Sequence, residues 1–245
     1  SYDFVLQGLE YAKKGNVMKE NTQKAVELFE KAIEVEPSYA RAHAWRACTL
    51  SNLADWEENP DPKIFENAFE SAKLALELDS NEPEVHRIMG ALKLWYERDH
   101  DTARYHFEKA RELCPSDVFI ISRYAIMLIY FCEFDKALEE LERAKRLDPF
   151  SHDLLFGPEA ICHYWLDDPE KALQTFKKVK VKKNYLFYIA LTHKKSGDND
   201  QASENLKEAH ALTGMDNDSF IGSQPFKNQD VVSFLKNELS EIQTN

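Results

Sequence analysis

The chain has 245 residues, 43% of them hydrophobic and 12% aromatic, which is enough to bury a core without disulfides or metals. Lys and Arg total 31 against 43 Asp and Glu, and the net charge of −12 excludes nucleic acid as an expected partner, because such a charge repels phosphates. Only 7 Gly and 9 Pro occur, which excludes loop-rich all-β architectures and leaves an all-α fold as the expectation.

The cysteines and the apolar windows indicate a cytoplasmic location. The four cysteines form no CxxC pair and fall in or beside apolar helical stretches, which is typical of free thiols in a reducing compartment. No window approaches the roughly 18 uninterrupted apolar residues of a membrane span. The sequence starts at Ser1 without a signal peptide or an initiator methionine, and we interpret it as a domain of a longer polypeptide.

A small-x3-large-x2-small motif recurs along the chain, and the first residues of successive copies lie 43, 35, 34, 35 and 30 residues apart. Its copies are Ala25/Phe29/Ala32, Ala68/Ala72/Ala75, Ala103/Phe107/Ala110, Ala137/Leu141/Ala144, Ala172/Phe176/Val179 and Ala202/Leu206/Ala209. These positions share one helical face, where small residues let a neighbouring helix approach closely. An apolar periodic stretch precedes each copy, at residues 4–14, 40–54, 84–98, 118–131, 152–166 and 185–195.

Each unit is therefore predicted to be a pair of antiparallel helices, and such a pair cannot bury its apolar face alone. The sequence predicts a right-handed superhelical solenoid of about six pairs over residues 1–222. The repeats are expected near 2–37, 38–80, 81–115, 116–149, 150–183 and 184–214. Residues 223–245 are predicted to form a turn and a C-terminal capping helix, with Val231, Phe234, Leu235, Leu239 and Ile242 on one face.

The first repeat is similar to the tetratricopeptide pattern W-x2-L-G-x2-Y followed by A-x3-F-x2-A. It carries Phe4, Gln7-Gly8 and Tyr11, and Met89-Gly90 matches the same Leu-Gly step. A narrower resemblance, in residues 28–43, the acidic loop after Asp55-Trp56 and the ending Gln224-Pro225-Phe226, is to the C-terminal repeat region of bacterial class III adenylate/guanylate cyclases. The same type of region follows winged-helix regulator and TIR-type domains. This resemblance implies a regulatory or assembly role beside a catalytic or effector domain.

The motifs of catalysis and cofactor binding are absent from the sequence. The eight His residues show neither HxxxH nor HExxH spacing, and no P-loop, GxSxG or GxGxxG occurs. We therefore expect no catalytic, cofactor-binding or metal-binding residues, no cofactor, and no enzyme activity. An enzyme in its own right remains a third hypothesis.

The one strong basic run is Lys177-Lys178-Val179-Lys180-Val181-Lys182-Lys183. It is suited to docking an acidic partner or an anionic surface. A solvated face at the C-terminal end of a helix, where cations complement the dipole, is the favoured interpretation.

In tetratricopeptide solenoids the first helix of each repeat lines the concave groove. Three pairs share a face on these predicted helices: Arg41 with Trp45, Arg87 with Leu94, and Arg123 with Tyr130. Arginines beside aromatic residues suit an acidic peptide, through bidentate carboxylate contacts and rigid anchors. The alternative, with the aromatic residues in the core and the arginines solvated, is weighted equally.

The leading hypothesis is a non-catalytic protein–protein interaction and regulatory scaffold that binds a protein or peptide, an acidic one in particular. We expect it to be the C-terminal region of a larger bacterial signalling protein of cyclase, regulator or TIR type. The alternative is a small-molecule- or peptide-sensing domain that controls an attached enzyme or transcription factor.

Overall fold

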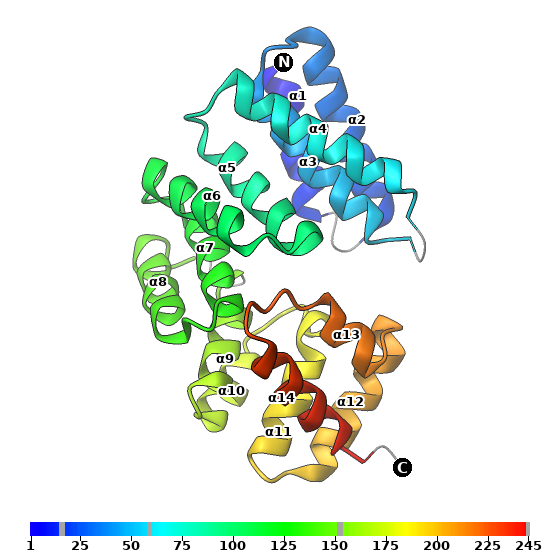
Figure 1. The fold of residues 1–245 in the computed structure, drawn as a ribbon, viewed down its shortest axis with the longest axis vertical. Coiled ribbons are helices and arrows are strands. Elements are labelled where there is room, and N and C mark those ends of the chain that lie inside the picture. The colour runs from blue at the N-terminus through cyan, green and yellow to red at the C-terminus, as the bar shows by residue number, and fades with distance from the viewer. Residues whose placement is uncertain (15–17, 58–59, 151–153, 244–245) are drawn as a thin grey trace. The chain divides into compact units, whose positions relative to one another are not determined.

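The structure is a computed structural model, and it describes residues 1–14, 18–57, 60–150 and 154–243. The described residues form fourteen α-helices, the π-helix Lys93–Glu97 and the 3₁₀-helix Lys182–Tyr185, and no strand occurs among them. The predicted all-α solenoid of paired helices is confirmed. The chain divides into two compact units, Ser1–Cys114 and Pro115–Asn245. Each unit contains three antiparallel helix pairs (Figure 1).

The first unit consists of three stacked pairs. Its helices are α1 (Tyr2–Lys14), α2 (Lys19–Val35), α3 (Ala40–Ala54), α4 (Pro62–Leu78), α5 (Pro83–Leu92) and α6 (His100–Leu113). Helix α3 packs on α2 and α4, and α5 packs on α3, α4 and α6, so each pair packs on the pair before it. The acidic loop after Asp55-Trp56 is only partly described, because residues 58–59 lie outside the described residues.

The second unit begins with three further pairs and ends with two single helices. The pairs are α7 (Val118–Tyr130) with α8 (Phe134–Leu147), α9 (Phe156–Trp165) with α10 (Pro169–Phe176), and α11 (Leu186–Lys195) with α12 (Asn199–Thr213). Helices α13 (Asn217–Ser223) and α14 (Gln229–Ser240) follow. The first helix expected at 152–166 begins at Phe156, and residues 151–153 lie outside the described residues.

The motif residues lie in the core, where they set the spacing of the paired helices. Ala25, Phe29 and Ala32 are each 0% exposed. A Cβ added at Gly8 would lie 2.7 Å from the Phe29 ring, and one added at Gly90 would lie 2.9 Å from the Phe107 ring. Glycine in the first helix therefore lets the aromatic ring of the second helix reach its backbone, because any larger side chain would push the ring away.

Four hairpins turn through one residue in the left-handed region, followed by an acidic residue. The turning residues are Arg98 (φ 57), Cys132 (φ 62), Asp167 (φ 63) and Gly197 (φ 85). In three of these turns an aspartate follows and caps the second helix: Asp99 accepts from the amide of Thr102, Asp168 from that of Lys171, and Asp198 from that of Gln201. In these three hairpins, the left-handed residue and the aspartate cap together fix where the second helix begins.

The third repeat departs from the predicted regular helix over 84–98. Its first helix continues as a π-helix, Lys93–Glu97, before the left-handed Arg98. A π-turn inserts one extra residue and rotates the side chains that follow it. Leu94, which was expected to face the groove, is 0% exposed in the core.

Two further sequence predictions can be compared with the structure. The four cysteines are free thiols, with Cys162 buried. No helix among the described residues has both the length and the apolar character needed to cross a bilayer.

Candidate partner-binding site

Arg41 lies at the start of α3 and already binds a carboxylate of its own chain. Its Nε and Nη2 donate to the two oxygens of Glu82, over 3.1 and 3.0 Å. Burial lowers the pKa of Arg41, but the hydrogen bonds and charge of Glu82 outweigh it, so the pKa is raised. The Arg41 side chain is 40% exposed, which leaves one side of this fork open to solvent.

Arg87 and Trp45 lie together, but inside the first unit rather than on its surface. Arg87 is 3% exposed, its Nε donates to Glu84 over 2.8 Å, and its guanidinium lies 5.0 Å from the centre of the Trp45 ring. Trp45 also stacks on Phe29, with ring centroids 6.2 Å apart. These contacts make Trp45 a bridge between the cores of the first two repeats.

Arg123 and Tyr130 both belong to α7 in the second unit. Arg123 is half-buried, with its guanidinium 4.8 Å from the centre of the Phe119 ring. Arg41 and Arg87 belong to the first unit. That the six predicted residues line one partner-binding groove therefore stays a prediction, and Leu94 and Arg87 have little surface with which to contact a partner.

The segment between α13 and α14, residues 224–228, lies against the C-terminal end of α7. The amide of Lys227 donates to the carbonyl of Tyr130 over 2.9 Å. The hydroxyl of Tyr130 donates to the side chain of Gln224 over 3.2 Å, and Lys227 Nζ lies 5.3 Å from the Phe131 ring centre. The main chain of this segment thus satisfies a carbonyl that the end of α7 leaves without a helical partner.

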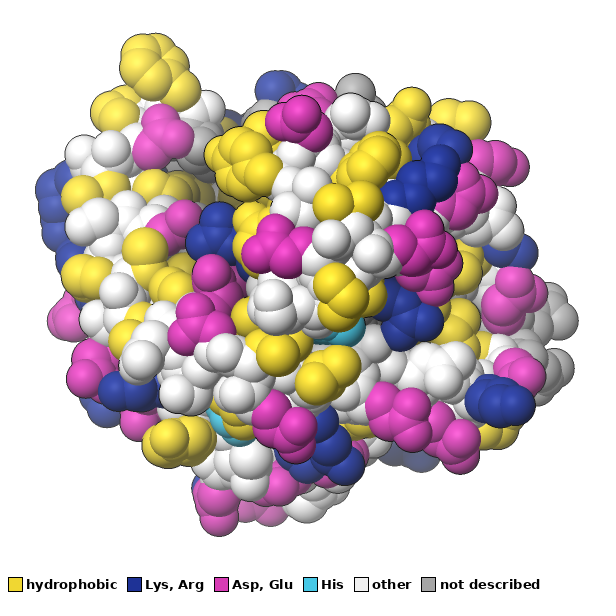
Figure 2. Space-filling view, turned by 90° about the horizontal axis from the view of Figure 1, so that it is seen from above, with side chains coloured by type: hydrophobic (Ala, Val, Ile, Leu, Met, Phe, Trp, Pro, Cys, Tyr) yellow, Lys and Arg dark blue, Asp and Glu magenta, His cyan; other side chains and the backbone are white. Residues whose placement is uncertain are grey.

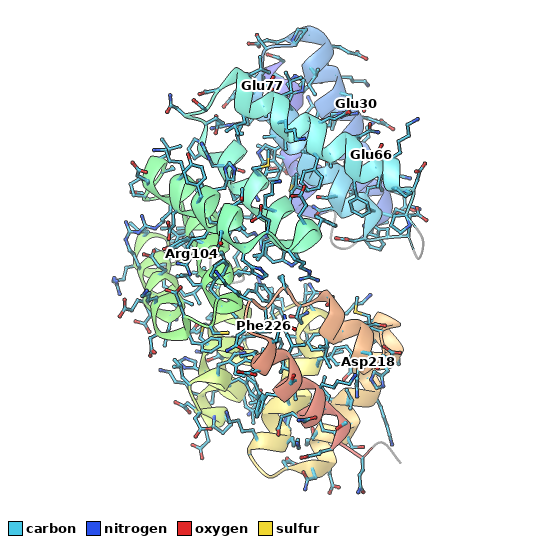
Figure 3. All side chains as sticks on the ribbon, in the orientation of Figure 1. Glu30, Glu66, Glu77, Arg104, Asp218 and Phe226 are labelled. Carbon is cyan, nitrogen blue, oxygen red and sulfur yellow. The ribbon has the colours of Figure 1, made fainter. Side chains whose placement is uncertain are left out.

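Phe226 is the anchor of this segment (Figure 3). It is 3% exposed and meets the rings of Tyr130 and Trp165 edge-on, with centroids 5.1 and 5.8 Å away. Trp165 stacks in turn on Phe134, 5.2 Å away at an interplanar angle of 7°. We call Tyr130, Trp165 and Phe134 the aromatic box. It is built by α7, α8 and α9, and the sequence shows no local pattern that brings these residues together.

Buried polar groups border the aromatic box. Tyr164 is 0% exposed, and its hydroxyl makes no hydrogen bond within the described part of the chain. Burial raises the pKa of Tyr164, and the charge of Glu238 raises it further. Lys195 donates to the carbonyl of Tyr164 over 2.9 Å and lies 4.8 Å from its ring centre. The aromatic box is therefore bordered by a buried polar layer, in which Lys195 contacts both the ring and the carbonyl of Tyr164.

A buried ion pair joins α8 to α9 in the same unit. Lys145 Nζ donates to Glu159 over 2.6 Å, and His163 Nε2 lies 3.8 Å from the same carboxylate oxygen. Burial raises the pKa of Glu159, but His163 and Lys145 outweigh it, so the pKa is lowered. Glu159 is 6% exposed, so this charged group holds two helices together away from solvent.

The first unit also has a groove that sequence reasoning missed. It has a volume of about 470 Å³ and lies between α2, α3 and α4, with Glu30, Glu34, Glu70, His43 and Arg46 in its lining. Figure 3 labels Glu30 on α2, together with Glu66 and Glu77 on α4. Arg46 donates to Glu30 over 3.1 Å and to Ser71 over 2.5 Å across the groove. In the sequence, the only available sign of this groove was the four-residue spacing of Glu30 and Glu34, which places both carboxylates on one face of a helix.

No family model and no curated protein matches the chain. Among solved structures, IFIT1 with Gppp-AAAA superimposes with a TM-score of 0.69 and 19% identity, covering 98% of this chain and 58% of that one. PilW, a type IV pilus biogenesis factor, gives a TM-score of 0.61 and 18% identity, with 89% and 96% covered. A tetratricopeptide repeat protein from Parabacteroides merdae gives a TM-score of 0.56 and 13% identity, with 97% and 83% covered. The chain therefore has the fold of a tetratricopeptide-repeat solenoid.

Proposed function

We propose that the chain is a non-catalytic protein-interaction and regulatory scaffold that binds polypeptide segments on the exposed side of its first helices. The observation that carries this proposal is the docking of residues 224–228 on α7. One extended segment is held there by a main-chain hydrogen bond and one buried aromatic anchor, which is how solenoid surfaces recognise peptides.

The aromatic box is suited to a phenylalanine or a similarly sized ring. Two edge-on contacts, at 5.1 and 5.8 Å, give an aromatic anchor an advantage of about 0.5–1.5 kcal/mol per pair beyond its buried area. The carbonyl of Tyr130 fixes the main chain beside the anchor. A partner segment competing for this site would carry an aromatic residue followed by a free backbone amide.

An acidic partner is the second part of the proposal, and Arg41 supports it best. Its guanidinium holds Glu82 in the two-pronged geometry that a partner carboxylate would adopt. A partner Asp or Glu would exchange with Glu82 on the open side of Arg41. Arg123 is the corresponding candidate on α7, whereas Arg87 would first have to leave the core.

The proposed cellular context rests on the resemblance of residues 28–43 and 224–226 to the C-terminal repeat region of bacterial class III cyclases. We place the chain in the cytoplasm as the C-terminal region of a larger bacterial signalling protein of cyclase, regulator or TIR type. The interaction surface would then control an attached catalytic or effector domain. The alternative, a sensor for a small molecule, is supported by the open groove beside Arg46.

The test of the aromatic box uses a fluorescent peptide that copies residues 222–230 and the full chain with Gln224→Ala and Phe226→Leu. This double variant keeps an apolar anchor, so it should fold, while the internal segment binds more weakly. The peptide should bind the double variant and bind the parent chain less, as measured by fluorescence anisotropy. A peptide with alanine in place of phenylalanine is the matched control and should bind weakly.

Two outcomes would contradict the proposal. One is equal binding of both peptides to the double variant. The other is no binding to a double variant whose circular dichroism matches the parent. For the acidic partner, Arg41→Ala with Arg123→Ala should weaken capture of an acidic peptide, while circular dichroism verifies that the variant, which loses the Arg41–Glu82 ion pair, stays folded. A thermal shift with metabolites alone would favour the small-molecule alternative.

A further inference from the structure

The second unit contains a long stretch of chain without acidic residues. No Asp or Glu occurs between Glu170 and Asp198, in a protein that has 43 of them. Five lysines lie close together within this stretch, at positions 177, 178, 180, 182 and 183, and all five are exposed. We call residues 177–183 the lysine segment. It joins α10, which ends at Phe176, to the 3₁₀-helix Lys182–Tyr185.

The lysine segment is held on the unit by apolar contacts at several points. Val179 is 6% exposed, and the ring of Tyr185, just beyond the segment, packs 6.0 Å from that of Phe176. Lys178 Nζ lies 5.5 Å from the centre of the Phe156 ring on α9. The exposed lysines therefore extend from a backbone whose position is fixed, so that less entropy is lost when they bind a ligand.

Other lysines of the same acid-free stretch are neutralised within the unit. Lys194 pairs with Glu238 and Glu241, at 3.1 and 2.7 Å, and Lys195 pairs with Asp167 at 3.0 Å. By contrast, Lys177, Lys182 and Lys183 make no ion pair within the described residues. On the face that Figure 2 shows, Lys and Arg side chains lie scattered among Asp and Glu side chains.

Helix electrostatics account for only part of the lysine segment. Lys177 lies at the C-terminal end of α10, where the helix dipole favours a cation. Lys182 and Lys183 lie instead just before the N-terminus of α11, which begins at Leu186. The positive end of that dipole disfavours cations. The helix dipole therefore does not account for the two cations at that position.

We propose that the lysine segment is a docking site for an acidic segment of a partner protein. Val181, which is 53% exposed between lysines, provides the apolar contact, so the matching partner carries Asp or Glu on both sides of an aliphatic residue. The net charge of −12 repels polyanions of large extent, so a short acidic peptide is favoured over nucleic acid or an anionic membrane. This site is separate in residues and chemistry from the aromatic box.

The experiment uses a fluorescein-labelled peptide of four glutamates, one leucine and four further glutamates, with a glutamine version as control. Binding to the full chain is measured at low salt and across a salt titration. The test variant is Lys177→Gln, Lys182→Gln and Lys183→Gln. The matched control is Lys31→Gln, Lys63→Gln and Lys73→Gln, three exposed lysines of the first unit, which removes the same charge.

The test variant should lose about tenfold in affinity, corresponding to about 1.4 kcal/mol, with a shallower salt dependence, while the control variant binds like the parent. Equal affinities for the two triple variants would overturn the proposal. So would equal binding of the glutamate and glutamine peptides. Binding of the parent chain to phosphatidylserine vesicles without binding of the peptide would also overturn it, in favour of a membrane surface. Thermal melts verify that both variants fold.

Discussion

The ring of Phe226 packs edge-on against the ring of Tyr130, with 5.1 Å between centroids and 69° between planes. Phe226 lies after the last helix pair, and Tyr130 ends the first helix of the second unit. The contact therefore closes the second unit by joining the two ends of its sequence. Helix α14 strengthens the closure with Leu235 and Leu239, both 0% exposed. Residues 224–228 thus cover the C-terminal ends of α7 and α9, which are first helices of their pairs.

Replacing Phe226 with alanine should destabilise the second unit by about 3–5 kcal/mol, because the change removes a buried ring and leaves a cavity. Phe150→Ala is the matched control, since Phe150 is 95% exposed and its loss should change stability by less than about 0.5 kcal/mol. Urea denaturation followed by circular dichroism measures both. Similar midpoints for the two variants would show that Phe226 is not an anchor.

Gly90→Ala should destabilise the first unit by about 1–3 kcal/mol, because the new methyl group would lie 2.9 Å from the Phe107 ring and force the paired helices apart. Gly222→Ala in α13 is the control. Nothing lies within 4 Å of the added carbon there, so alanine should be neutral or stabilising by up to about 1 kcal/mol. Thermal melts compare them. A Gly90→Ala chain as stable as the parent would argue against the close helix approach.

Asp167→Gly should stabilise the second unit by up to about 1 kcal/mol, because Asp167 has φ 63 and only glycine adopts that region without strain. The loss of its exposed ion pair with Lys195 reduces the gain slightly. Asp168→Gly should have the opposite sign, since it removes the cap on Lys171. If both changes destabilise the chain equally in chemical denaturation, the left-handed turn carries no strain.

The first unit should lose stability in mild acid through His106. Its Nδ1–H donates to His86 Nδ1 over 2.9 Å, because His86 uses its own Nε2–H on the carbonyl of Ser80. Burial, then the charges of His86 and Lys93, lower the pKa of His106 to about 4. Above pH of about 6.5 His106 is neutral in both the folded and unfolded states, so it contributes no pH dependence there.

As the pH falls from about 6.5 towards 4, the unfolded chain takes up a proton at His106 that the folded chain does not, which costs up to about 3 kcal/mol. Denaturation midpoints measured between these pH values report the loss. His106→Gln should flatten this pH dependence, while His100→Gln serves as a control on the same helix. A profile that His106→Gln leaves unchanged would assign the acid sensitivity to other groups.

The six predicted residues show how far sequence reasoning reaches into the site. The spacing of Arg41 and Trp45 placed both on α3 correctly, but it carried no information about Glu82, which reaches Arg41 from the loop before α5. Leu94 was predicted to share a groove face with Arg87, but the two residues are 0% and 3% exposed, so this face of the helix lies in the core. Tyr130 was chosen as a groove residue, whereas its partners Gln224 and Phe226 come from beyond the last repeat.

The sequence by itself determined the helix pairs. Each small-large-small motif marks one face of a helix, and the apolar stretch before each motif marks the helix that pairs with it. Both features depend on the spacing of apolar residues over one or two helical turns, which can be identified in the sequence directly. Only the tertiary structure decided which arginines are already paired, that Cys132 and Asp167 adopt left-handed conformations, and that Phe226 fills the aromatic box. Those features depend on contacts between residues far apart in the chain, and stacking the repeats is what brings them together.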